Sequence, residues 1–266
     1  MDPARPALRM PAKTSSMAKQ KSGGWLESIK TIVYAGLIAI GIRTVAFEPF
    51  NIPSGSMIPT LLVGDYLFVS KYSYGYSRHS MPFSPNLFSG RIFGSLPERG
   101  DVVVFKLPRD NSTDYIKRII GLPGDRVQVR GGVLHLNGQP VRREFLGNYT
   151  VEGDGPRMVV RQFREILPPQ PGIEPHAHNI LEMSDDQPFD NTQEYVVPAG
   201  HVFAMGDNRD NSLDSRAQNA VGFIPIENLV GRAEFIFFSV DGSARWWEVW
   251  GWPMAVRWSR LLSAVR

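Results

Sequence analysis

The sequence predicts a mainly β fold, in which an antiparallel β-sheet domain with an accessory subdomain follows one N-terminal transmembrane helix. Three observations support this prediction. A long apolar segment lies near the N-terminus, short runs rich in β-branched and aromatic residues follow it, and turn residues separate these runs. The chain of 266 residues contains 25 Gly and 21 Pro, which favour many turns and short strands over long helices.

The first part of the chain divides into a tail and an apolar segment. Residues 1–24 are predicted to be a disordered tail, since they hold five basic residues against one acid. The uncharged centre of the apolar segment has only 12 residues, too few to cross about 30 Å of hydrocarbon. Residues 26–47 supply 22 positions, with Lys30 and Arg43 near the ends, where long basic side chains reach the headgroups. We therefore predict a transmembrane anchor over residues 25–48.

Two alternatives to an anchor are a buried helix of a soluble domain and a cleaved signal peptide. The signal peptide is disfavoured because no small-residue cleavage site follows the apolar segment. The basic residues of the tail precede the segment, so the positive-inside rule predicts a single-pass protein with a cytoplasmic N-terminus. Everything after residue 48 then lies on the outer side of the membrane.

From residue 49 onward the pattern is that of β-strands. Short runs rich in β-branched and aromatic residues predict strands at 65–71, 101–106, 125–130, 195–197, 202–205 and 232–240. Residues 133–136 followed by Asn137-Gly138 predict a β-hairpin, because this dipeptide favours the tight turn that a hairpin needs.

Changes in composition suggest how the β region is divided. Residues 142–194 are polar and Pro-rich with little periodicity, so we predict an insertion or accessory subdomain that separates a β-domain of residues 49–141 from its second part, 195–240. Residues 241–266 hold five of the six tryptophans, mixed with arginines. Trp favours the membrane–water interface and Arg suits anionic headgroups, so this tail is predicted to lie at the membrane interface, with a core edge as the alternative.

Composition also removes several kinds of chemistry. The chain has no cysteine, which excludes disulfides, thiolate nucleophiles and Cys-ligated zinc. The net charge of +3 is not gathered into one basic block, so nucleic-acid binding is not expected. Residues 206–216 are rich in acids, but Arg209 at the third position and the lack of Gly at the sixth do not fit a calcium loop. We therefore expect no metal and no cofactor.

A serine and a lysine stand out as candidates for catalysis. Ser56 follows Gly55 between two prolines, a rigid turn that can present a hydroxyl beside a free backbone N–H. A serine nucleophile needs a base, and none of the five histidines has a recognisable Asp/Ser pairing. Lys117 lies in an apolar, β-prone run, where burial would lower its pKa from about 10.4 toward neutrality. From these residues alone, a plain loop and a solvent-facing lysine fit as well.

Four segments together resemble the motifs of the bacterial type I signal (leader) peptidases. They are Ile-Pro-Ser-Gly-Ser-Met at 52–57, Arg-Gly-Asp at 99–101, Tyr-Ile-Lys-Arg at 115–118 with Gly-Leu-Pro-Gly-Asp at 121–125, and Gly-Asp-Asn-Arg-Asp-Asn-Ser-Leu-Asp-Ser-Arg at 206–216. Their order, their spacing and the preceding anchor fit the family, and the resemblance extends from about residue 25 to 240. Some members of the family have two membrane spans, whereas we predict one here. Others carry a disulfide, which this chain cannot form because it has no cysteine.

The resemblance implies a role for each matched residue. Ser56 would be the nucleophile, Lys117 its neutral general base, and Ser212 a hydrogen-bond partner that orients the lysine amine. The backbone N–H of Ser56 and the hydroxyl of Ser54 would form the oxyanion hole. Supporting residues would be Gly206, Asp214 and Arg216, and shallow substrate pockets would be lined by Ile52, Pro53, Met57, Leu61, Tyr115 and Ile116.

The resemblance also implies an activity and a location. The chain would be a membrane-bound serine endopeptidase of the bacterial inner membrane that removes signal peptides from exported preproteins after Ala-x-Ala sites, through an acyl-enzyme. Its partners would be those signal peptides, membrane lipid and the nearby protein-export machinery. A specialised or self-cleaving Ser/Lys peptidase and an inactive peptide-binding domain are the alternatives. A self-cleaving repressor would carry a DNA-binding helix-turn-helix, and an inactive domain would most simply have lost Ser56 or Lys117.

Overall fold

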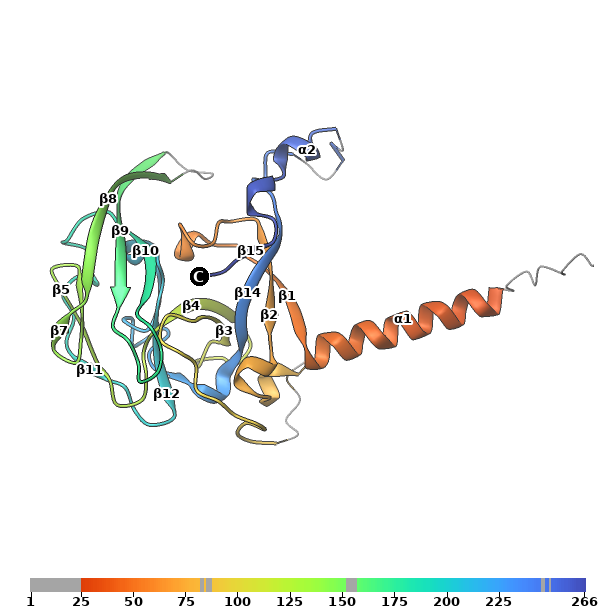
Figure 1. The fold of residues 1–266 in the computed structure, drawn as a ribbon, viewed down its shortest axis with the longest axis horizontal. Helices are drawn as coiled ribbons and strands as arrows, with labels where there is room; N and C mark the ends of the chain where they lie inside the picture. The colour runs from red at the N-terminus through yellow and green to blue at the C-terminus, as the bar shows by residue number, and fades with distance from the viewer. Residues whose placement is uncertain (1–24, 82–83, 85–87, 152–156, 245–246, 249) are drawn as a thin grey trace, which may run out of the picture. The chain divides into compact units, whose positions relative to one another are not determined.

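The computed structural model describes residues 25–81, 84, 88–151, 157–244, 247–248 and 250–266, shown as a coloured ribbon in Figure 1. The predicted basic tail, residues 1–24, lies outside the described residues. The described chain divides into two compact units, the first ending at Ile40 and the second beginning at Gly41.

The N-terminal helix α1 covers Trp25–Val45, 21 residues. A helix of this length extends about 31 Å, which matches the hydrocarbon thickness of a bilayer. Its stretch Glu27–Val45 has a mean hydropathy of 1.4, none of it is buried, and it is the one helix among the described residues long and apolar enough to cross a membrane. The helix ends before the predicted boundary at residue 48, because Phe47 already begins a β-strand.

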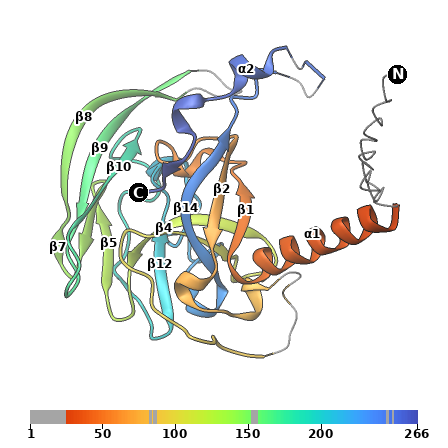
Figure 2. The ribbon, with the colours of Figure 1, turned by 45° about the vertical axis from the view of Figure 1, so that its right-hand side comes forward.

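The largest sheet is antiparallel and holds the N-terminal strands beside strands from much later in the chain. Its order is β1-β2-β14-β3-β4-β12-β13, with β15 paired to β14. Figure 2 shows β14 next to β2, with β1 on the other side of β2. The bounds are Phe47–Asn51 (β1), Asp65–Ser70 (β2), Val102–Lys106 (β3), Asp114–Gly121 (β4), His201–Met205 (β12), Ile224–Pro225 (β13), Leu229–Ser239 (β14) and Ser263–Ala264 (β15).

Two smaller antiparallel sheets complete the β structure. One has the order β11-β5-β6-β7, and the other has the order β10-β9-β8. The bounds are Arg126–Arg130 (β5), Val133–Leu136 (β6), Gln139–Pro140 (β7), Arg142–Val151 (β8), Met158–Leu167 (β9), His176–Glu182 (β10) and Tyr195–Val196 (β11). Short helical turns include η1 (Gly55–Met57), η2 (Tyr72–Tyr74), η3 (Arg78–Ser80), η4 (Arg209–Asn211), η5 (Ile226–Asn228), α2 (Trp252–Ala255) and η6 (Trp258–Arg260).

The mainly β fold predicted from the sequence is confirmed, and so is its N-terminal apolar helix. The predicted hairpin turn is formed by Asn137 and Gly138, whose φ angles of 52° and 80° lie in the left-handed region that this dipeptide adopts readily. The stretch for which we predicted an insertion or accessory subdomain, residues 142–194, contains the separate sheet of β8, β9 and β10, and none of these strands was predicted individually. Strand β8 alternates irregularly between exposed and half-buried positions, so it carries no clear periodic signal.

The hydrophobic core under the largest sheet supports the loop between β1 and β2. It comprises Ile52, Met57, Leu61, Leu67, Val69, Val102, Val104, Ile116, Val230, Ala233 and Ile236. Three of these residues, Ile52, Met57 and Leu61, belong to the β1–β2 loop, which is therefore anchored to the sheet by its own apolar side chains.

Candidate active site

Ser56 lies on the short turn η1, in the loop between β1 and β2. The two ends of this loop are joined where the Ile52 N–H donates to the Asp65 carbonyl (2.8 Å) and the Gly64 N–H donates to the Ile52 carbonyl (3.0 Å). The Ser56 side chain is nearly buried, with 8% of the residue exposed. Because the two ends of the loop are hydrogen-bonded together and Ser56 is nearly buried, the Ser56 hydroxyl is held in one position.

Lys117 on β4 places its amine beside the Ser56 hydroxyl. The distance from Lys117 Nζ to Ser56 Oγ is 2.7 Å, and Nζ also donates to the carbonyl of Ile116 at 2.8 Å. Only 3% of Lys117 is exposed, and this burial lowers its pKa from 10.5 to about 8. The nearby carboxylates of Asp214 and Asp207 act in the opposite direction and keep the pKa from falling further.

The predicted oxyanion residue Ser54 lies next to Ser56. Its Oγ is 3.5 Å from Ser56 Oγ, and both residues line the same cavity. A hydroxyl at this distance can donate to an oxyanion that forms on a carbonyl carbon attacked by Ser56.

Ser212 lies in the same cavity but does not make the predicted hydrogen bond to Lys117. Its Oγ is buried, and no partner among the described residues meets it at hydrogen-bond geometry. The absence of a side chain at Gly206 lets Ser212 pack directly against the backbone of residue 206. A Cβ at this glycine would overlap the Ser212 side chain and the carbonyl oxygen of Ser56. Position 206 therefore tolerates no side chain without a shift of the backbone.

Asp214 and Arg216 form a buried pair behind the site. The guanidinium donates from Nε to one carboxylate oxygen and from Nη2 to the other, both at 2.9 Å. Burial raises the pKa of the Asp214 carboxyl, but the Arg216 charge outweighs this, so the pKa of Asp214 is lowered and the group is ionised. The carboxylate also accepts from the Gly206 N–H at 3.0 Å, which fixes the backbone next to Ser212.

Asn208, to which no role was assigned from the sequence, holds the loop that carries Ser56 through two hydrogen bonds. Its backbone N–H donates to the carbonyl of Ser56 (3.1 Å), and its side-chain amide donates to the carbonyl of Gly55 (3.0 Å). The neighbours of Asn208 are fixed by buried ion pairs, Asp207 with Arg118 and Arg209 with Glu165. The only sequence signal for this role was its position inside the last of the four motifs.

A cavity of about 590 Å³ opens at Ser56 and Lys117. Of the six predicted pocket residues, Pro53, Tyr115 and Ile116 line it. The other three do not: they are packed in the core below the loop, with exposures of 3% for Ile52 and 0% for Met57 and Leu61. Lining residues that were not predicted are Gly55, Asp114, Asp210, Asn211 and Leu213.

The chemistry that this arrangement supports is acyl transfer by a serine with an amine base. Within the described part of the chain, no three His, Asp or Glu side chains are grouped as metal ligands. A neutral amine in contact with a hydroxyl can take its proton when the hydroxyl attacks a carbonyl, and can return a proton to the leaving group.

Comparison with known proteins agrees with this chemistry. The family model described as "Signal peptidase, peptidase S26" matches residues 25–238. The chain is 41% identical to signal peptidase I of Rickettsia typhi over 242 residues, 89% of this chain and 85% of the relative. It is 44% identical to signal peptidase I of Rickettsia prowazekii over 216 residues, 79% of this chain and 78% of the relative. A crystal structure of a signal peptidase I from Enterococcus faecalis aligns with 52% of this chain and 97% of its own, at 24% identity and a TM-score of 0.29.

Proposed function

This chain belongs to the signal peptidases of the peptidase S26 family and is a serine-type peptidase that removes signal peptides; we propose that it does so with a dyad of Ser56 and Lys117. We further propose that it cuts exported preproteins after Ala-x-Ala sites through an acyl-enzyme. The observation that carries the dyad is the 2.7 Å contact between Lys117 Nζ and Ser56 Oγ in a nearly buried site.

Lys117 starts the reaction in its neutral form. With a pKa of about 8, roughly a tenth of the enzyme has this form at pH 7. The neutral amine takes the proton of Ser56 as the hydroxyl attacks the scissile carbonyl carbon. The negative charge that develops on the carbonyl oxygen is stabilised by the backbone N–H of Ser56 and the hydroxyl of Ser54.

The protonated lysine then completes the cycle. It donates its proton to the leaving amine, which frees the mature protein and leaves the signal peptide esterified to Ser56. The lysine, neutral again, takes a proton from the water molecule that attacks this ester and passes it to Ser56 Oγ as the acyl–oxygen bond breaks, which releases the signal peptide and restores both side chains. Asp214 and Arg216 keep the surrounding loop in place, and Ser212 is a further candidate for orienting the amine once substrate displaces solvent from the cavity.

Substrate binding is supported by the free edge of β4. Strand β12 pairs with β4 only from Arg118 to Gly121, so on that side Asp114–Lys117 has no strand partner within the described residues. An extended peptide can add there as a further strand, with its side chains directed at Pro53, Tyr115 and Ile116. We propose that these three side chains, which surround the reacting centre, leave room for Ala in the substrate but not for larger residues.

Location is the second part of the proposal. Helix α1 supplies a single anchor, which we propose lies in the bacterial inner membrane with a cytoplasmic N-terminus, near the export machinery. The C-terminal segment exposes large apolar side chains suited to lipid, namely Trp247, Trp250, Trp252, Met254 and Trp258. Arg245 and Trp246 of the predicted interface tail lie outside the described residues.

The test is cleavage of an Ala-x-Ala preprotein by the full-length protein in detergent micelles, with the products identified by mass. The wild type should cut directly after the second Ala, while Ser56→Ala and Lys117→Ala should both lose the activity. Ser259→Ala, a change at an exposed serine, is the matched control and should cut normally. Turnover by Lys117→Ala close to that of the wild type would show that the dyad is assigned incorrectly.

A further inference from the structure

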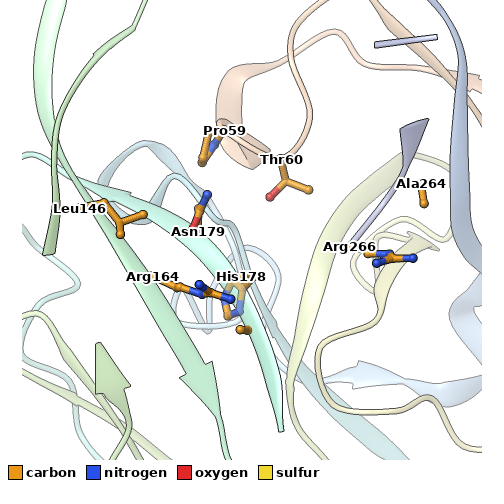
Figure 3. Close-up of a pocket in the computed structure, with 9 residues that line it drawn as sticks. Pro59, Thr60, Leu146, Arg164, His178, Asn179, Ala264 and Arg266 are labelled. Atoms are coloured by element: carbon orange, nitrogen blue, oxygen red, sulfur yellow. The ribbon is translucent and has the colours of Figure 1, made fainter. Parts of the chain in front are cut away.

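A second cavity, of about 490 Å³, lies beside the segment that follows the nucleophile (Figure 3). Pro59 and Thr60 line it from this segment, three and four residues after Ser56. The other walls come from β8, β9 and β10 and from the end of the chain, β15 and Arg266. A cavity of this size accommodates a side chain together with its own backbone.

The lining of this cavity is cationic. Arg164 and Arg266 lie on opposite sides of it (Figure 3), and neither side chain makes an ion pair within the described part of the chain. No Asp or Glu is among the residues that line the cavity, and the main-chain oxygen of Arg266, the last residue, accepts from Arg118 Nη2 at 3.2 Å. The exposed guanidinium groups of Arg164 and Arg266 therefore produce a positive potential there, which the terminal carboxylate of Arg266 reduces but does not cancel.

The acids just beneath the cavity do not cancel this charge, because each already has its own arginine. Arg118 donates to both carboxylate oxygens of Asp207, at 2.8 and 2.7 Å. Arg209 donates to both oxygens of Glu165, at 2.9 and 2.6 Å. The buried layer is thus balanced, and the arginines of the wall remain available for a ligand.

His178 adds an unpartnered polar group to the cavity wall. Its side chain is fully buried, and neither ring nitrogen makes a hydrogen bond to any described residue. Nε2 lies 3.5 Å from Glu165 and 3.9 Å from Asp207. Burial, together with the charge of Arg118, holds the pKa of His178 well below its usual value, so the ring is neutral and keeps one N–H to donate.

We propose that this cavity binds a carboxylate side chain of the preprotein, located in the mature part shortly after the cleaved bond. The inference rests on the proposed function and names an additional feature of its substrates. Four extended residues span at most about 14 Å, so a peptide held at Ser56 reaches the surroundings of Thr60 within a few positions. Arg164 and Arg266 would pair with an Asp or Glu that arrives there, and the lining offers nothing to neutralise a Lys.

The experiment uses the full-length protein in detergent and a set of preproteins that are identical except at one position. Asp, Asn and Lys are placed in turn at each of the second to fifth mature residues, and kcat/KM is measured for each. At one or two of these positions Asp should exceed Asn by about two- to fivefold, the range expected for an exposed ion pair. Lys should fall below Asn at the same positions.

Variants of the wall then test whether the cavity is responsible. Arg164→Ala with Arg266→Ala should reduce the Asp-to-Asn ratio to about one, whereas Arg142→Ala, a change at an exposed arginine on β8 outside the cavity, should keep it. Arg164→Glu should reverse the preference in favour of Lys, a gain that a misfolded protein cannot produce. An Asp preference that survives the double substitution would overturn the proposal.

The same measurements distinguish failure of the carboxylate site from failure of the proposed peptidase activity. If the wild type cuts all substrates with equal efficiency, the carboxylate site is wrong while the proposed peptidase activity stands. If the wild type cuts none of them, the proposed function fails and this inference fails with it.

Discussion

Cleavage should rise about tenfold for each pH unit below about pH 8 and then level off, because only neutral Lys117 can act as the base. Burial lowers the pKa of this lysine to about 8. With that value the neutral fraction is roughly one half at pH 8, one tenth at pH 7 and one hundredth at pH 6. An unperturbed lysine would instead give an acid limb that continues to rise up to about pH 10.

The assay is kcat/KM for one Ala-x-Ala preprotein between pH 5.5 and 10, in buffers of constant ionic strength. Because kcat/KM reports the free enzyme, its midpoint gives the pKa of Lys117 before substrate binds. Near-ultraviolet circular dichroism at each pH shows whether the protein stays folded. The substrate should carry no group that titrates near pH 8, so that the midpoint belongs to the enzyme.

Two results would refute this reasoning. A rate that is independent of pH between 6 and 8 would mean that no group with a pKa of about 8 has to lose a proton. A midpoint near 10 would mean that Lys117 is solvated in the working enzyme, so that burial does not generate the base.

Three further predictions follow from single contacts. Asn208→Ala removes the side-chain amide that donates to the Gly55 carbonyl. We expect kcat to fall about tenfold with little change in KM, and an unchanged melting temperature would show that the variant is folded. Gly206→Ala places a methyl group where Ser212 and the Ser56 carbonyl lie; we expect activity to fall at least about a hundredfold, and normal turnover would contradict the packing described. Lys117→Met should increase the free energy of unfolding below pH 8. The shift in pKa from 10.5 to about 8 means that the folded state holds the charged lysine less favourably than the unfolded state, by about 3 kcal/mol. This deficit falls as pH rises from 8 to 10.5, so guanidinium titrations should show a gain of about 3 kcal/mol at pH 7 and only about 1 kcal/mol at pH 10.

The sequence was most informative where local chemistry decides the structure. The dipeptide Asn137-Gly138 predicted its own turn, and strands β2, β3, β5 and β12 coincide with runs of β-branched and aromatic residues. The pairing of Ser56 with Lys117 was expected from four matched motifs, since nothing in the residues alone brings two positions 61 apart in sequence into contact.

The sequence was least informative where the structure of a segment depends on which distant segment it packs against. Met57 and Leu61 were assigned to the substrate pocket, yet their side chains point into the core, because the direction of a loop residue depends on what the loop packs against. Asn208 could not be singled out, since its two acceptors are backbone carbonyls, which every residue has. Among the described residues, strand β8 pairs with β9 alone, and it is half exposed, so neither face imposes a hydrophobic pattern.

The position of β14 between β2 and β3 has a consequence for the order of synthesis. The loop with the nucleophile is attached to β2, and the lysine lies on β4, which pairs with β3; within the sheet, the strand that joins these two halves is Leu229–Ser239. The ribosome makes that strand more than a hundred residues after Lys117. A nascent chain still missing β14 has its serine and its lysine on unconnected pieces of sheet, so proteolytic activity should appear only when translation is nearly finished.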